Sequence, residues 1–251
     1  MDIHKPKPIH SWRAFLLELG TIVLGVGIAL GAEQTVEWLH WKNRVADARA
    51  AIVLELRDDN GPQAFTRLAV ADCFERQLVS LRDAIEVDRP RAEIWTLIDD
   101  YRMQGRTWDM GAWTALLGSD LAAHIPPEQL ILWGLPYIHV PRLSELTAQE
   151  RQDFIALHLF RRSGERLSSA EADAMLASVT RLRFENRAMR NAANILLGSM
   201  KRNGIEVTPQ QKSRILAGLK DHFQGCVITP SIVPGDHDDN TTFLKRPLAP
   251  L

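Results

Sequence analysis

Few residue groups in this 251-residue chain have the types and spacing that catalysis or metal binding requires. The sequence contains no Gly-rich phosphate loop and no Gly-x-Ser-x-Gly, His-Glu-x-x-His or Cys-x-x-Cys motif. Its densest group of metal-ligand types is Gly-Asp-His-Asp-Asp-Asn at residues 235–240, which lacks the alternating spacing and the closing Glu of a calcium loop. We interpret residues 235–240 as a solvated turn, and we predict neither a bound metal nor a cofactor.

A cluster of aromatic and polar residues is the second candidate site. Four of the seven tryptophans lie within residues 91–141, where Gly and Pro divide the chain into short pieces. Aromatic walls with a few polar groups are typical of a ligand pocket. The alternative is that these aromatic side chains close one end of a helical bundle and bind nothing. The residues of the candidate pocket are Trp95, Trp108, Asp109, Trp113 and His124.

The two cysteines, Cys73 and Cys226, are too few to form a tetrahedral zinc site by themselves. They could form one disulfide, which requires an oxidising compartment. Such a bridge would tie the segment after the last predicted helix to the second helix. The alternative is two unrelated residues, one of them a small buried hydrophobe. The compartment therefore matters, and it depends on the N-terminal region.

The N-terminal region contains an apolar run at residues 14–32, interrupted by Glu18 and Thr21. The run is close to the roughly 20 residues that a helix needs to cross a bilayer. A cleaved signal peptide is one interpretation, because residues 29–31 offer the small side chains that a peptidase reads. We favour a retained anchor, because the helical pattern continues beyond Ala32 without a break, towards two tryptophans suited to an interfacial belt.

The orientation of the anchor rests on its nearest flanks. Three basic residues precede the run and three follow it within the window that counts, so the positive-inside rule gives a tie. Arg13 adjoins the start of the run, whereas Glu33 and Glu37 follow its end. We therefore predict a cytoplasmic N-terminus and an exported body.

Three residues of the run could contact another membrane helix. Glu18 is costly inside a bilayer unless it is protonated, reaches the interface or meets a partner. Gly27 and Gly31 form a small-xxx-small element, which lets two helix backbones approach closely. The bland alternative is that Glu18 only reaches towards the headgroups and that the glycine spacing is accidental.

The sequence at residues 11–45 resembles the N-terminus of a broad group of uncharacterised bacterial single-pass membrane proteins, a domain family of unknown function. The shared features are a Trp-led start, an early acid, a Gly-Val-x-Ile-Ala-Leu core, a polar pair and a Trp in the stem. In this chain they are Trp12, Glu18, residues 25–30, Glu33-Gln34 and Trp38. The resemblance covers about the first fifth of the chain. It implies an uncleaved anchor with a helical exported body, and no activity.

The rest of the chain has the periodicity of helices, with no sustained alternation that would indicate strands. We expect the stem helix to end at residues 58–61, and a second helix from Pro62 to fold back against it. A capping box at Ser168–Glu171 starts the clearest helix. Its apolar face repeats in steps of four and three, as in a coiled coil. This seam consists of Met175, Val179, Leu182, Asn186, Met189, Ala193, Leu196 and Met200.

We therefore predict an all-α protein, with a transmembrane helix continuing into an antiparallel helical bundle that has a coiled-coil-like seam. The predicted parts are a cytoplasmic head at residues 1–13, an anchor at 14–32, a helical body at 33–225 and an irregular tail at 226–251.

The formal net charge of −1 gives no strong field that would recruit nucleic acid. The predicted partners are the lipid bilayer and either another protein or a second copy, met through the membrane helix or the seam. The predicted location is the bacterial inner membrane with the body in the periplasm. The favoured function is an interaction or scaffolding module without catalysis. The alternative is an envelope enzyme or small-ligand binder whose site lies within residues 91–141.

Overall fold

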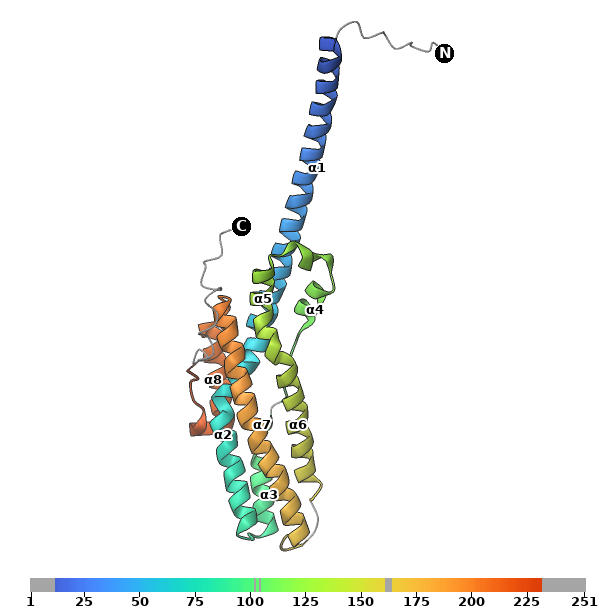
Figure 1. Ribbon diagram of the computed structural model, residues 1–251. Helices are drawn as coiled ribbons and strands as arrows, with labels where there is room; N and C mark the ends of the chain where they lie inside the picture. Colours follow the sequence, from blue (N-terminus) through green and yellow to red (C-terminus); the bar gives the residue numbers. More distant parts are fainter. Residues whose placement is uncertain (1–11, 102, 104, 161–163, 232–251) are drawn as a thin grey trace, which may run out of the picture. The chain divides into compact units, whose positions relative to one another are not determined.

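The computed structural model describes residues 12–101, 103, 105–160 and 164–231. The acidic group at 235–240, most of the predicted head and most of the predicted tail lie outside the described residues. Every regular element in the described part is helical and none is a strand, which confirms the all-α prediction (Figure 1). The chain forms two compact units, residues 1–48 and 49–251, and the boundary falls within the first helix, α1 (Trp12–Leu54).

The described part of the first unit is α1 as far as Ala48, and it includes the apolar run. This is the one helix in the described residues that is long and apolar enough to cross a membrane, and none of its apolar window is buried. The side chains of residues 16–30 are exposed on every side of the helix, for example Leu17 at 74%, Val23 at 63% and Ile28 at 65%.

The second unit is built around three long helices. These are α2 (Gly61–Glu86), α6 (Val140–His158) and α7 (Ser169–Arg202). Helix α7 packs along both α2 and α6, and the shorter α8 (Pro209–Phe223) packs on α2 (Figure 1). Shorter elements connect α2 to α6. They are α3 (Arg91–Asp100), α4 (Gly111–Leu117), η2 (Asp120–His124), α5 (Pro127–Gly134) and η3 (Leu135–His139), and a last short turn, η4 (Gln224–Cys226), follows α8.

The reversal predicted at residues 58–61 is wrong. Residues Glu55–Asn60 form one π-helical turn, η1, and α2 follows it directly with Gly61 in a helical conformation. The wider turn brings the Gly61 N–H to the Leu56 carbonyl, and Pro62 then starts the new α-helical stretch, where its missing N–H is tolerated.

Close packing explains why the chain stays helical there. A Cβ on Gly61 would lie 2.7 Å from the Leu56 carbonyl oxygen and 2.7 Å from the Met200 Cε of α7. Only glycine permits this approach, so the Asp-Asp-Asn-Gly sequence serves contact with α7 instead of a turn. Tertiary packing here overrides the local turn preference.

The structure buries the predicted seam of α7. All eight seam residues are buried within the second unit, including Met189 at 0% exposure. The predicted capping box is also present: the Ser168 side chain accepts from the Glu171 N–H, and the Glu171 carboxylate accepts from the Ser168 N–H. At the other end Gly204 has a φ of +70°, which glycine adopts without strain.

Candidate functional site

The five residues of the candidate aromatic pocket lie in separate surroundings. Trp95 of α3 is buried in the core cluster that α2, α7 and α8 share, with its ring 6.2 Å from that of His158. Trp108 precedes α4, and its indole N–H donates to the Thr147 Oγ1 at 2.9 Å. These two tryptophans therefore contribute to the packing of the body.

Asp109 and His124 lie elsewhere. The backbone of Asp109 is held by the Asn60 side chain, which donates to its carbonyl at 2.7 Å and accepts from its N–H at 2.9 Å. His124 is at the end of η2 and is exposed. No pocket found within the described residues brings the five predicted side chains together. A binding role for them stays a prediction.

Trp113 is the member of that set that does line a groove. Its ring stacks on Tyr137 with centroids 5.4 Å apart, and Gly134 permits the contact, because a Cβ there would lie 2.8 Å from the indole. The groove has a volume of about 380 Å³ and an almost wholly apolar wall. It is lined by Trp113, Leu117, Leu130, Ile131, Gly134, Leu135, Tyr137 and Ile138.

Glu55 fixes one side of this apolar groove. Its carboxylate accepts from the Tyr137 hydroxyl at 2.6 Å and from the Ala112 N–H at 2.8 Å, which places a negative charge at the start of α4. Burial, followed by the hydrogen bond to Glu55, raises the pKa of Tyr137 well above its usual range. Tyr137 is therefore a neutral donor that supports the aromatic stack.

A buried ionic centre joins α2, α6 and α7. The Arg67 guanidinium donates to the Glu150 carboxylate and to the side-chain amide oxygen of Asn186, each at 2.8 Å. Both charged side chains are 0% exposed, and Asn186 also donates to the Ala71 carbonyl at 3.0 Å. A buried pair of this kind is satisfied in one alignment of the helices, so it can hold that alignment.

A second arginine enters the centre from the connection between α3 and α4. The Arg106 side chain is 1% exposed, with its Nη1 3.5 Å from the Glu150 Oε2, and none of its three nitrogens has a hydrogen-bond partner among the described residues. The Tyr101 hydroxyl donates to the same carboxylate at 3.4 Å. Two guanidinium groups thus face one carboxylate. We call these residues the ionic centre: Arg67, Tyr101, Arg106, Glu150 and Asn186.

Burial shifts the pKa values in this centre more than the neighbouring charges do. It lowers the pKa of Arg106 to about 10, with a further contribution from the neighbouring charge of Arg67. It also raises the pKa of Tyr101 above its usual range, helped by the Glu150 carboxylate. Arg106 therefore keeps its charge at neutral pH, and two buried guanidinium groups face the single Glu150 carboxylate.

Glu185 of α7 lies close to the ionic centre, and its shifted pKa favours the neutral form of the side chain. Burial raises its pKa to about 8, and the charge and hydrogen bond of Asp153 add to the shift. Arg181 instead pairs with Asp153, at 2.6 Å. Glu185 is accordingly protonated at neutral pH and can donate a hydrogen bond to Asp153. Pairs of interacting carboxyl groups of this kind occur in active sites, but they also occur in structural networks.

Sequence analysis identified Asn186 on the seam but missed the charged members of the ionic centre. The signal for Arg67 was present, because it lies three residues before Val70 and seven before Phe74, on the same buried face of α2. A similar signal was present for Glu150, which lies four residues after Leu146 and seven after Leu143 on the buried face of α6. Arg106 gave no such signal, since it lies outside any helix.

The predicted disulfide is present and links the end of the chain's helical part to α2. Cys73 and Cys226 are bridged with their Cα atoms 5.3 Å apart. The Ile228 N–H then donates to the Ala69 carbonyl at 3.1 Å, and Arg76 donates to the Cys226 carbonyl at 3.3 Å. The segment Val227–Ser231 is therefore held along α2.

The predicted contact residues of the membrane helix lie on an open surface of the first unit. Glu18 is exposed, and a Cβ added at Gly27 or Gly31 would meet nothing within 4 Å. Their contact with another helix stays a prediction.

Comparison of the chain with protein-family models, with curated proteins and with solved structures finds no match. Within the described residues no group of three or more His, Cys, Asp or Glu side chains is arranged to hold a metal ion. Three buried groups with shifted pKa values, Tyr101, Arg106 and Glu185, lie outside the residues that line the two larger grooves.

Proposed function

We propose that this protein is a single-pass membrane protein of the bacterial envelope whose helical body binds another envelope component. The anchor is the apolar part of α1, the N-terminus is cytoplasmic and the body lies in the periplasm. The resemblance of residues 11–45 to uncharacterised bacterial single-pass proteins supports a retained anchor. The proposal gives the chain a role in interaction or scaffolding, with no reaction of its own.

The observation that carries the proposal is the combination of a disulfide and an apolar helix in one chain. The bridge between Cys73 and Cys226 would be reduced in a bacterial cytosol but maintained in the periplasm. The apolar helix has no buried side chain in its central window, so an aqueous location would expose all of it to water. Both features favour a chain that crosses a membrane and exposes its body on the oxidising side.

The proposed body is an antiparallel helical bundle with coiled-coil packing along the seam of α7. Because the chain's own helices bury the seam, the proposed partner contact is the membrane helix. Its proposed contact face carries Gly27 and Gly31, where small residues allow a second helix to approach closely. Glu18 lies about 180° around the helix from Gly27, so its predicted contact would be on the opposite face. The partner is a transmembrane helix of another envelope protein or of a second copy.

Site-specific photocrosslinking in native membranes tests this contact. A photoreactive residue at position 27 should give one discrete adduct, which mass spectrometry then identifies. The control is position 28, because Ile28 is also exposed but lies about 100° around the helix from Gly27 and about 80° from Glu18. Equal labelling at both positions, or adducts with lipid alone, would contradict a specific helix contact.

One observation favours the alternative function of a small-ligand binder. The apolar groove beside Trp113 and Tyr137 has a volume of about 380 Å³, within the range of ligand pockets. Its exposed rim includes Ile131 at 60% and Ile138 at 64%. A ligand there would be apolar and would be fixed by little more than shape. Replacing Gly134 with Ala would place a Cβ 2.8 Å from the Trp113 ring and should displace this wall of the groove, so loss of ligand binding in that variant would support the alternative.

A further inference from the structure

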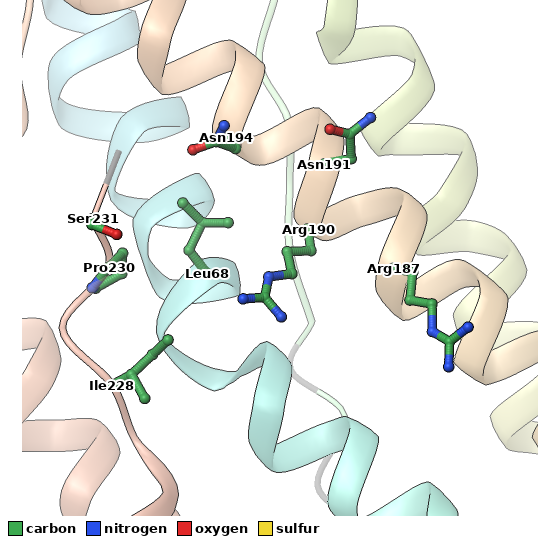
Figure 2. Close-up of a pocket in the computed structure, with 8 residues that line it drawn as sticks. All are labelled: Leu68, Arg187, Arg190, Asn191, Asn194, Ile228, Pro230 and Ser231. Carbon is green, nitrogen blue, oxygen red and sulfur yellow. The ribbon is translucent and has the colours of Figure 1, made fainter. Parts of the chain in front are cut away.

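A second groove in the body has a different chemistry. It has a volume of about 340 Å³ and lies between α7, α2 and the segment that follows the disulfide. Figure 2 shows the lining side chains on these three elements. The lining residues are Leu68, Arg187, Arg190, Asn191, Asn194, Ile228, Pro230 and Ser231.

The two walls of this groove differ in polarity. Leu68 of α2 and Ile228 and Pro230 of the C-terminal segment form an apolar wall. Arginine and asparagine side chains from successive turns of α7 form the polar wall. Figure 2 shows the Arg190 side chain reaching from α7 towards α2. A ligand that fills the groove therefore meets cationic donors on one side and aliphatic carbons on the other.

The cations beside the groove outnumber their carboxylate partners. Glu75 accepts from both Arg183 and Arg187, at 2.6 and 2.8 Å, and Asp72 accepts from Arg190 at 2.7 Å. Three guanidinium groups thus share two carboxylates. Arg187 and Arg190 each use one nitrogen in these bonds, so each retains donors for another acceptor.

We propose that this groove binds a small organic anion, a carboxylate attached to an apolar group. The carboxylate would accept charge-assisted hydrogen bonds from Arg187 and Arg190, and the apolar part would pack on Leu68, Ile228 and Pro230. The excess positive charge beside the groove favours an anion over a neutral ligand. The volume suits a compound of modest size.

The disulfide makes this site conditional on an oxidised chain. The wall formed by Ile228 and Pro230 is attached through Cys226 to Cys73, through the Ile228 N–H to Ala69 and through Arg76 to the Cys226 carbonyl. Without the bridge, one apolar wall loses its covalent attachment to α2. Ligand affinity should then fall even though both arginines remain in place.

Fluorine NMR on the full chain in phosphatidylcholine nanodiscs tests the site, with 4-fluorophenylacetate as the probe. This compound combines a carboxylate with an apolar ring and can be compared with 4-fluorobenzyl alcohol, which has the ring alone. We expect saturable binding of the acid at one site, much weaker binding of the alcohol, and no signal change with empty nanodiscs. Absence of saturable binding below about 10 mM, the weak limit for a specific small ligand, would overturn the proposal.

Matched variants locate the binding. Replacing both groove arginines, Arg187→Gln with Arg190→Gln, should weaken binding about tenfold or more, as expected for the loss of charge-assisted bonds. Arg183→Gln removes a guanidinium from the same Glu75 cluster but not from the groove, and should change affinity less than about twofold. Equal effects of the two changes would overturn the site.

The bridge is tested with the same probe. Reduction of the disulfide, or replacement of both cysteines by Ser, should weaken binding about threefold or more, while Arg183→Gln in the oxidised chain does not. A circular-dichroism spectrum in each state separates loss of the wall from loss of the fold. A folded, reduced chain that binds the acid with unchanged affinity would overturn the dependence on the bridge. These results do not depend on the photocrosslinking outcome, since the groove lies in the body.

Discussion

Two apolar helical faces in this chain meet opposite surroundings. On α1 the side chains from Leu16 to Leu30 are exposed all round the helix, whereas the seam of α7 is buried throughout by the chain's own helices. Leu, Val and Ala occur in both, so residue type alone does not explain the difference. The seam places apolar residues on one face, with charged residues such as Arg183 and Arg187 outside it. The apolar run has no polar face, which is typical of a helix surrounded by lipid.

The two faces are stabilised by contact with different surroundings. The seam gains from burial against protein, at roughly 25 cal/mol for each Å² of apolar surface removed from water. The apolar run can gain the same only from a bilayer or another helix, because nothing in the described chain covers it. Changes to the seam should therefore alter the stability of the body, and changes to the run should alter membrane retention.

The largest effect is expected at the middle of the seam. Met189→Asp would place an unpaired charge at a site with 0% exposure and should reduce the free energy of unfolding by about 5 kcal/mol. The control is Phe184→Asp on the same helix, since Phe184 is 65% exposed and its replacement should cost about 0.5 kcal/mol or less. Thermal unfolding in detergent, followed by tryptophan fluorescence, measures both. Similar melting temperatures for the two variants would mean that the seam faces solvent.

The ionic centre should give the next largest effect. Glu150→Gln leaves Arg67 and Arg106 buried without a counter-charge and should cost about 3 to 5 kcal/mol. Glu145→Gln on the same helix removes one partner of an exposed pair with Arg142 and should cost less than about 1 kcal/mol. Unfolding curves in denaturant compare them. If the two substitutions cost the same, the centre does not hold the helices together.

Glu185 should give a smaller effect that depends on pH. Its folded pKa is raised from 4.5 to about 8, so between these values the folded chain holds a proton that the unfolded chain releases. Stability should therefore decline as the pH rises from 4.5 to about 8, and level off above that. Glu185→Gln should remove most of this slope and gain about 2 kcal/mol at the alkaline end. Asp173→Asn, an exposed change on the same helix, should leave the slope intact.

The smallest effect on the body is expected from the apolar run. Val26→Asp lies where Val26 is 53% exposed, and it should change the melting temperature of the body by no more than measurement error. It adds about 3 kcal/mol to the cost of membrane insertion, so the fraction of protein in membranes should fall. Alkaline extraction of membranes measures this fraction. A destabilised body together with an unchanged fraction of protein in membranes would contradict the roles assigned to the two faces.

The sequence predicted those parts of the fold in which a local signal and packing agree. Ser168 and Glu171 form the predicted capping box, and the step pattern from Met175 to Met200 predicted the buried face. The disulfide was predicted from compartment and position. For the capping box and the buried face, the local pattern has one favourable physical outcome.

The predictions failed where contacts between residues far apart in the sequence determine the structure. The turn predicted at Asp58–Gly61 is replaced by a π-helical turn, because Gly61 packs closely against Met200 from far along the chain. The ionic centre escaped prediction because Glu150 and Arg106 are buried only after α6 and the α3–α4 connection meet α2. The tryptophans of residues 91–141 looked like one cluster in the sequence, yet Trp95 and Trp113 serve different parts of the body.

The central claim is that the apolar helix is retained as an anchor and that the body lies in an oxidising compartment. Mass spectrometry of the intact protein from separated membrane and soluble fractions, alkylated before and after reduction, tests both parts at once. We expect a membrane-bound chain that keeps its N-terminal region and whose Cys73 and Cys226 react with the alkylating reagent only after reduction. A soluble chain beginning near Ala32, or two cysteines that are alkylated without reduction, would contradict it.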